Sequence, residues 1–82
     1  MSEQIKQIAL RIKELREISK VSIEDLAAKL KVPVETYKQY ESGTYDIPVS
    51  FLYEIANMFN VDLTAILTGE DPKLRTYSLV RK

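Results

Sequence analysis

Residues Ser22–Pro48 read SIEDLAAKLKVPVETYKQYESGTYDIP and contain two short amphipathic segments in immediate succession. The first segment covers Ile23–Leu30 and the second covers Val34–Ser42. Only Lys31–Pro33 separates them, and the proline at the end of this break suits a helix start because it has no N–H to donate. Two short helices with so tight a joint must cross at a large angle.

This arrangement is typical of the helix-turn-helix unit, whose second helix is presented to the DNA major groove. Two features argue against a simple reading of DNA binding. The chain has 12 Lys and Arg against 12 Asp and Glu, so attraction to nucleic acid must come from local charge placement. In addition, the second helix carries Glu35.

Length and composition limit the classes of protein that this chain can belong to. Its 82 residues suit one domain with a modest core. It has no cysteine and no histidine, which excludes disulfides, thiolate metal sites and imidazole catalysis. The N-terminus is too charged for a signal peptide, and no apolar run approaches the roughly 20 residues that span a bilayer. We expect a cytoplasmic protein without a cofactor or membrane contact.

Three further helices are predicted outside the opening stretch. Apolar residues that recur at three- and four-residue steps predict a helix over Glu3–Ile18. The residues expected to face inward are Ile5, Ile8, Ile12, Leu15 and Ile18. The next helix covers Val49–Phe59, with Leu52, Ile55, Ala56 and Phe59 inward. The last covers Leu63–Leu67, with Asp62 as its N-cap and Gly69 at its end. The fold class is therefore all-α, a compact five-helix domain over residues 1–69.

Residues 70–82 differ in composition from the rest. Glu70–Pro72 is a helix breaker, and the RTYSLVRK that ends the chain favours an extended strand. A single strand is not stable alone. We expect an extended tail or linker, either mobile or paired with the same segment of a second copy.

Residues Ile8–Gly69 resemble the phage-repressor-like (Cro/CI or XRE-type) helix-turn-helix family. The similarity lies in SIEDLAAKLKV, in Tyr-Glu-x-Gly at Tyr40–Gly43 followed by Pro48, and in IANMFNVDLTAIL. It implies a lambda-repressor-like fold and double-stranded DNA as the partner. The tail DPKLRTYSLVRK resembles the segment that leads, in some larger members, into a C-terminal cupin-type sensor domain.

The resemblance also implies a structural pair. In this family a basic residue of the first helix pairs with the Glu at the end of the recognition helix, and the matching residues here are Arg16 and Glu41. A bidentate Arg–carboxylate pair would lock the first helix to the third. A catalytic Glu41 would need a partner acid, base or metal, and the sequence offers none.

Base reading in the family comes from the first turn of the third helix and the residues one turn on. Carried over, these positions are Val34, Glu35, Lys38 and Gln39. Gln39 suits adenine, Lys38 suits guanine or a phosphate, Glu35 can accept from cytosine N4, and Val34 can contact a thymine methyl. The alternative is that all four are only the solvated face of a short helix.

The sequence departs from the family pattern at three positions: Ile23 replaces a Gln, Pro33 replaces a Ser or Thr cap, and Thr44–Asp46 replaces a basic loop. Phosphate anchoring would then come from neutral donors and backbone amides, which can position a duplex but give each domain a low affinity. The candidates are Ser22, Tyr37, Thr44 and Tyr45, with Lys20, Lys29 and Lys31 supplying charge. Tyr37 is equally a candidate for the core.

These observations predict a sequence-specific DNA-binding domain of a transcriptional regulator, acting as a homodimer and not as an enzyme. Its recognition helix is Val34–Ser42. The alternative is a protein-interaction module, antitoxin-like or adaptor-like, on the same fold. Zero net charge, Glu35 and Asp46 favour this alternative.

Overall fold

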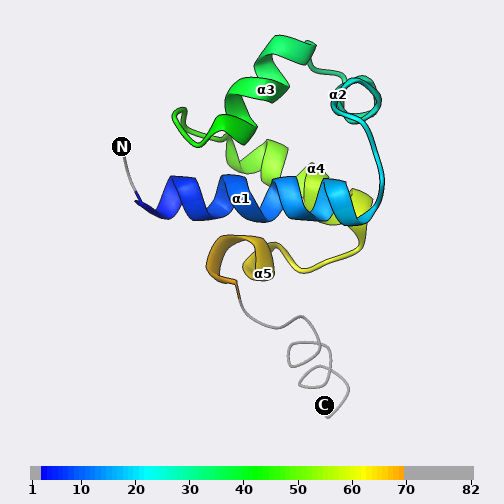
Figure 1. Ribbon diagram of the computed structural model, residues 1–82. Coiled ribbons are helices and arrows are strands. Elements are labelled where there is room, and N and C mark those ends of the chain that lie inside the picture. Colours follow the sequence, from blue (N-terminus) through cyan, green and yellow to red (C-terminus); the bar gives the residue numbers. More distant parts are fainter. Residues whose placement is uncertain (1–2, 70–82) are drawn as a thin grey trace.

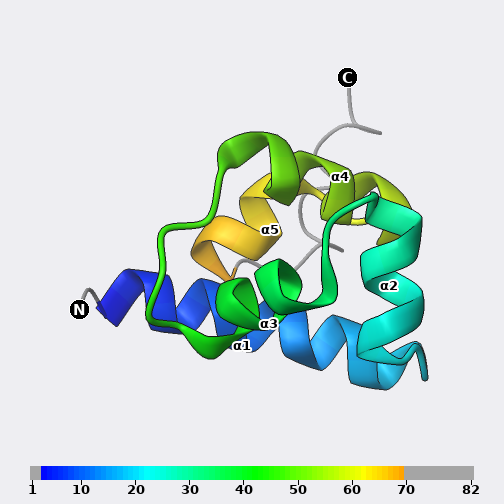
Figure 2. The same ribbon diagram turned by 90° about the horizontal axis from the view of Figure 1, so that it is seen from above.

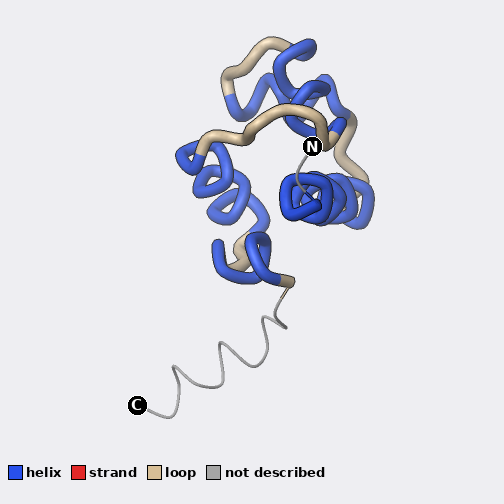
Figure 3. The backbone as a smooth tube through the Cα atoms, turned by 90° about the vertical axis from the view of Figure 1, so that its left-hand side faces the viewer, coloured by secondary structure: helices blue, strands red, loops and turns tan. Residues whose placement is uncertain are grey.

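The computed structural model describes residues 3–69, which form five helices joined by short loops (Figures 1 and 3). The helices are α1 (Glu3–Ile18), α2 (Ile23–Leu30), α3 (Val34–Ser42), α4 (Val49–Phe59) and α5 (Leu63–Thr68). The all-α fold and the five predicted helices are confirmed, and only the end of α5 differs, by one residue. The predicted extended tail, residues 70–82, lies outside the described residues.

Helix α1 is the longest element and separates the others. In Figure 1, α2 and α3 lie above it and α5 lies below it, with α4 behind. Helix α3 packs on both α1 and α2, and α5 packs on both α1 and α4. Seen from above, α3 lies over α1 and α2 stands at the C-terminal end of α1 (Figure 2). The helix-turn-helix pair is therefore supported by α1 rather than standing free.

Three of the four connections end in the same three-residue pattern, and the connection after α1 has one extra residue, Ser19, before it. In each, a non-glycine residue with positive φ is followed by a valine and then by the N-cap of the next helix. The valine N–H bonds the carbonyl five residues back, as in a Schellman motif. The left-handed residues are Lys20, Lys31 and Asn60, and the valines are Val21, Val32 and Val61. All three valines are partly buried against the core, so each turn is held by packing as well as by hydrogen bonds.

Most helix termini carry a residue whose chemistry suits the start or the end of a helix. Ser22 is the N-cap of α2, and its side chain accepts the backbone N–H of Asp25. Gly43 and Gly69 end α3 and α5 with φ of 80°, a left-handed conformation that favours glycine. Asp62 occupies the predicted N-cap of α5, but its side chain makes no capping hydrogen bond.

All five helices contribute to the core, including α5 through the buried Ile66. Tyr37 of α3 is fully buried at its centre, which decides between the two predicted roles of this residue in favour of packing. Phe51 of α4, which sequence reasoning did not place inward, is 6% exposed and contacts the rings of both Tyr37 and Tyr40. The tyrosines of α3 and a phenylalanine of α4 thus form an aromatic cluster that attaches α3 to the domain.

The predicted stripe of α1 fails at its C-terminal end. Ile8 and Ile12 are buried, but Ile18 is 77% exposed. Ile18 is the last residue of α1, and it lies on the rim of a shallow groove between α1 and α5 that also includes Leu15, Val61 and Ala65. Amphipathic spacing alone cannot show that, among residues 3–69, no other helix covers this last turn.

Candidate nucleic-acid interface

Arg16 and Glu41 form a bidentate ion pair between α1 and α3, with the geometry that the resemblance implies. Arg16 Nε donates to Glu41 Oε2 at 2.8 Å, and Arg16 Nη2 donates to Glu41 Oε1 at 3.2 Å. The two side chains are only 13% and 9% exposed. The pKa of Arg16 is raised chiefly by its hydrogen bond to Glu41, so the guanidinium stays charged. The pair connects α3 to α1 at the C-terminal end of α3.

Tyr37 also bonds this carboxylate. Its hydroxyl donates to Glu41 Oε2, one helical turn away on α3. Burial raises the pKa of the Tyr37 phenol, and the hydrogen bond and charge of Glu41 raise it further. The phenol is therefore a permanent donor at neutral pH, and Tyr37 is not available as a phosphate contact.

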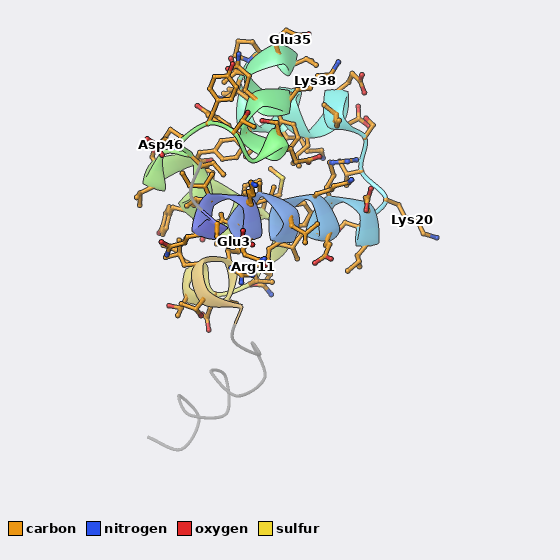
Figure 4. The ribbon with its side chains drawn as sticks, turned by 60° about the vertical axis from the view of Figure 1, so that its left-hand side comes forward. Glu3, Arg11, Lys20, Glu35, Lys38 and Asp46 are labelled. Atoms are coloured by element: carbon orange, nitrogen blue, oxygen red, sulfur yellow. The ribbon has the colours of Figure 1, made fainter. Side chains whose placement is uncertain are left out.

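The exposed face of α3 carries three of the four predicted reading residues. Glu35, Lys38 and Gln39 are exposed, whereas Val34 is half-buried and packs against the core. Figure 4 shows Glu35 and Lys38 at the outer part of α3, on the side away from α1. Pro33 gives α3 no side-chain cap, so the first backbone N–H groups of this helix remain without a capping side chain.

Ser22 directly precedes α2 as its N-cap, and it is exposed although its hydroxyl accepts the Asp25 N–H. A serine hydroxyl that accepts one hydrogen bond still has its own proton to donate. Ser22 can therefore cap α2 and donate to an anion at the same time.

The loop after α3 is ordered by a serine that the sequence reasoning did not single out. Ser42 Oγ bonds the Gln39 carbonyl at 2.6 Å and Thr44 Oγ1 at 2.7 Å, and it accepts the Thr44 N–H at 3.2 Å. This small cluster holds Thr44 against the end of α3, while Tyr45 next to it is 49% exposed. The Ser-Gly-Thr sequence, with two hydroxyls around a helix-ending glycine, was the available signal.

Charge around this face is mixed. Lys29, Lys31 and Lys38 are exposed on α2, on the following turn and on α3, but so are Glu24, Glu35 and Asp46. Figure 4 places Lys20 beside the C-terminal end of α1, apart from Glu35 and Lys38. Lys20 therefore lies away from the outer part of α3, although sequence reasoning expected it to supply charge near the phosphates.

The described residues offer neither a metal site nor a membrane-spanning helix. Among residues 3–69, no set of three or more acidic side chains is grouped closely enough to hold a metal ion. No helix in this part of the chain has the length and apolar character needed to cross a membrane. The face made by Ser22, the exposed side of α3, Thr44 and Tyr45 remains the main candidate site.

Comparison with known proteins identifies the family. No curated protein and no solved structure gives a significant match to the chain. The model of the helix-turn-helix domain family matches residues 9–72, which include all of α2, α3, α4 and α5. This segment makes up more than three quarters of the 82 residues. The chain therefore belongs to the helix-turn-helix domain family, a family of DNA-binding domains.

Proposed function

We propose that this chain is a sequence-specific double-stranded DNA-binding domain of a transcriptional regulator, of the phage-repressor-like type. The observation that carries the proposal is the exposed face of α3, a helix that the Arg16–Glu41 pair attaches to α1. Glu35 and Lys38 point away from α1 on this face (Figure 4), and Gln39 is exposed as well. In this arrangement α3 lies in the major groove and α2 crosses the backbone.

Each exposed residue has a chemical role in this proposal. Gln39 donates and accepts at adenine N6 and N7, and Lys38 donates to guanine or to a phosphate. Glu35 accepts from cytosine N4, while the half-buried Val34 offers only part of its side chain to a thymine methyl. A cytosine partner is required for Glu35, because a carboxylate near phosphates is otherwise repelled.

Neutral donors supply the backbone contacts. Ser22 lies at the start of α2, and Thr44 and Tyr45 follow α3. Hydroxyls and backbone N–H groups fix the register of a duplex without adding net charge. Binding should therefore depend only weakly on salt, since few counterions are released.

A single short reading helix contacts few base pairs, so the proposal includes a homodimer on two half-sites. It also includes a C-terminal sensor domain as a partner beyond residue 82, based on the resemblance of the tail. The domain division at residue 69 and the cytoplasmic location belong to the same proposal.

A protein-interaction module is the second candidate, because Tyr45, Val49 and Tyr53 are exposed large side chains close in sequence to Asp46. A mobility-shift assay with generic duplex at low salt separates the two. A repressor-like domain retains weak non-specific binding, whereas an adaptor binds no duplex.

The specific test compares Gln39→Ala with Lys38→Ala after selection of duplexes from a random library. Gln39→Ala is expected to relax the preference at one base pair by about 1–3 kcal/mol. If Lys38 contacts a phosphate, Lys38→Ala is expected to lower the affinity for all DNA sequences alike. It should also reduce the slope of log affinity against log salt concentration by about one unit. The exposed Gln7 and Lys13 of α1, each changed to Ala, are matched controls. An unchanged consensus for Gln39→Ala would remove Gln39 from the reading face.

A further inference from the structure

The Glu41 carboxylate accepts hydrogen bonds from residues of two helices, α1 and α3. Its carboxylate accepts Nε and Nη2 of Arg16 from α1 and the hydroxyl of Tyr37 from its own helix. Two of these three bonds converge on Oε2. Because the Glu41 side chain is only 9% exposed, water has little access to replace a lost donor.

The Tyr37 hydroxyl differs from the guanidinium in how it is held. The ring of Tyr37 is completely buried and lies 5.9 Å from the Phe51 ring, centroid to centroid. A ring packed in this way has no other rotamer to occupy, so its hydroxyl is aimed at Glu41 by the core itself. The rigid Tyr37 hydroxyl therefore orients the Glu41 carboxylate by itself, and the long Arg16 side chain adds further hydrogen bonds.

Arg16 extends the same network to the turn before α2. Its third donor, Nη1, bonds the Val21 carbonyl at 3.1 Å, and the Val21 N–H returns a bond to the Arg16 carbonyl at 3.1 Å. Val21 directly precedes Ser22, the N-cap of α2. The chain of bonds from Tyr37 through Glu41 and Arg16 therefore connects the recognition helix with the residue proposed to hold a phosphate.

We infer that Tyr37 is a positioning residue for DNA recognition: its buried hydroxyl orients Glu41 and Arg16 and so sets α3 relative to the start of α2. Tyr37 touches no DNA itself. This inference rests on the proposed function, because it explains how the two contact elements keep one geometry. Base reading tolerates small misplacement poorly, whereas phosphate contacts tolerate it well, so loss of the hydroxyl affects specificity first.

The test uses Tyr37→Phe, which removes one oxygen and keeps the ring in the core. The matched control is Tyr40→Phe on the same helix, whose ring also packs on Phe51 at 4.6 Å. The Tyr40 hydroxyl makes no hydrogen bond to any residue from 3 to 69, so its removal leaves the network intact. Both variants are assayed as full chains, with circular dichroism to verify that each folds.

Two duplexes serve as probes: the consensus that the parent protein selects, and a shuffled sequence of the same composition. Tyr37→Phe is expected to lower affinity for the consensus about tenfold and to leave affinity for the shuffled duplex and the salt slope unchanged. Tyr40→Phe is expected to change neither affinity. Equal losses on both duplexes, or no loss with Tyr37→Phe, would overturn the inference.

A measurement on the free protein tests the positioning role of Tyr37 independently of DNA binding. Backbone amide exchange is expected to speed up in α3 and at Val21 and Ser22 in Tyr37→Phe, but not in Tyr40→Phe. If the parent selects no consensus, the proposed function fails, and the exchange data then decide whether the network positions α3 and α2. Unchanged exchange at both places would show that the hydroxyl positions neither element.

Discussion

At the scale of single residues, loss of the Arg16–Glu41 ion pair is expected to lower the free energy of unfolding strongly. Both side chains are largely withdrawn from water, so removing one leaves the other charge buried without its partner. Glu41→Gln and Arg16→Met are each expected to lower the free energy of unfolding by about 3–5 kcal/mol. Denaturant melts measure this loss, with the exposed Glu17→Gln of α1 as the control. Variants that melt like the parent would show that the pair is not structural.

The Tyr37 phenol makes stability depend on alkaline pH. Its pKa lies above the ordinary value of 10.0 because burial disfavours the phenolate, and because the phenol donates a hydrogen bond to the negatively charged Glu41. Below pH 10 this contribution is fully present, since the phenol is protonated in both states. Above pH 10 the unfolded chain loses the proton that the folded chain retains, so stability falls as pH rises.

Removing that phenol should therefore flatten the alkaline part of the stability curve. Tyr37→Phe is expected to lose less stability per pH unit than the parent above pH 10.0, by up to about 1.4 kcal/mol per unit. Denaturant melts between pH 8 and pH 11 measure the two slopes, with the exposed Tyr53→Phe as the control for loss of a surface phenol. Parallel curves for parent and variant would contradict the assigned origin of the effect.

At the scale of elements, the repeated turn sets the angles between helices. Lys20, Lys31 and Asn60 adopt a left-handed conformation that is costly for residues with a Cβ. The valine that follows each of them packs on the core and holds the chain in that conformation. The turn between α2 and α3 is therefore held by the packing of Val32 and by two backbone hydrogen bonds. These interactions offset the backbone strain of the left-handed Lys31.

Relieving this strain should stabilise the domain. Lys31→Gly is expected to raise the free energy of unfolding by about 0.5–1 kcal/mol, because glycine adopts φ near 61° without the Cβ clash. Lys29→Gly, which removes the same charge from the exposed side of α2, should instead destabilise by about 1 kcal/mol. Thermal melts of the two variants measure the difference. A loss of stability in Lys31→Gly would show that the lysine side chain contributes more than its backbone costs.

At the scale of the whole molecule, the five helices already enclose a continuous core. Among residues 3–69, the core cluster and the partly buried residues around it run from Ile8 to Leu67. Truncation after Glu70 is expected to leave the melting temperature within about 2 °C of the parent, because the tail is predicted not to belong to the helical core. The oligomeric state of the same variant shows whether the proposed dimer depends on the tail. Melting and sedimentation measure the two effects.

The outcomes of this truncation separate three roles for residues 71–82. Loss of the dimer at unchanged stability supports an assembly element, and no change in either measurement supports a linker to another domain. A large loss of monomer stability would contradict the prediction, because Leu74, Tyr77 or Leu79 would then contribute to the helical core.

The secondary structure of residues 3–69 followed almost entirely from the sequence. Helix limits depend on local signals, namely apolar spacing and the residues that can cap or stop a helix, such as Ser22, Gly43 and Gly69. These signals act within one or two turns, so no knowledge of distant residues is needed. The Arg16–Glu41 pair was different, because it came from the family resemblance and not from spacing.

The tertiary structure alone decided which residues are covered and which donors meet. Tyr37 has an apolar ring and a polar tip, so its sequence position was compatible with the core or with a phosphate until α1 and α4 enclosed it. Ile18 continued a perfect apolar stripe and is nevertheless exposed, because no described element lies over the last turn of α1. Burial is a property of neighbours that are distant in sequence, and local pattern does not contain it.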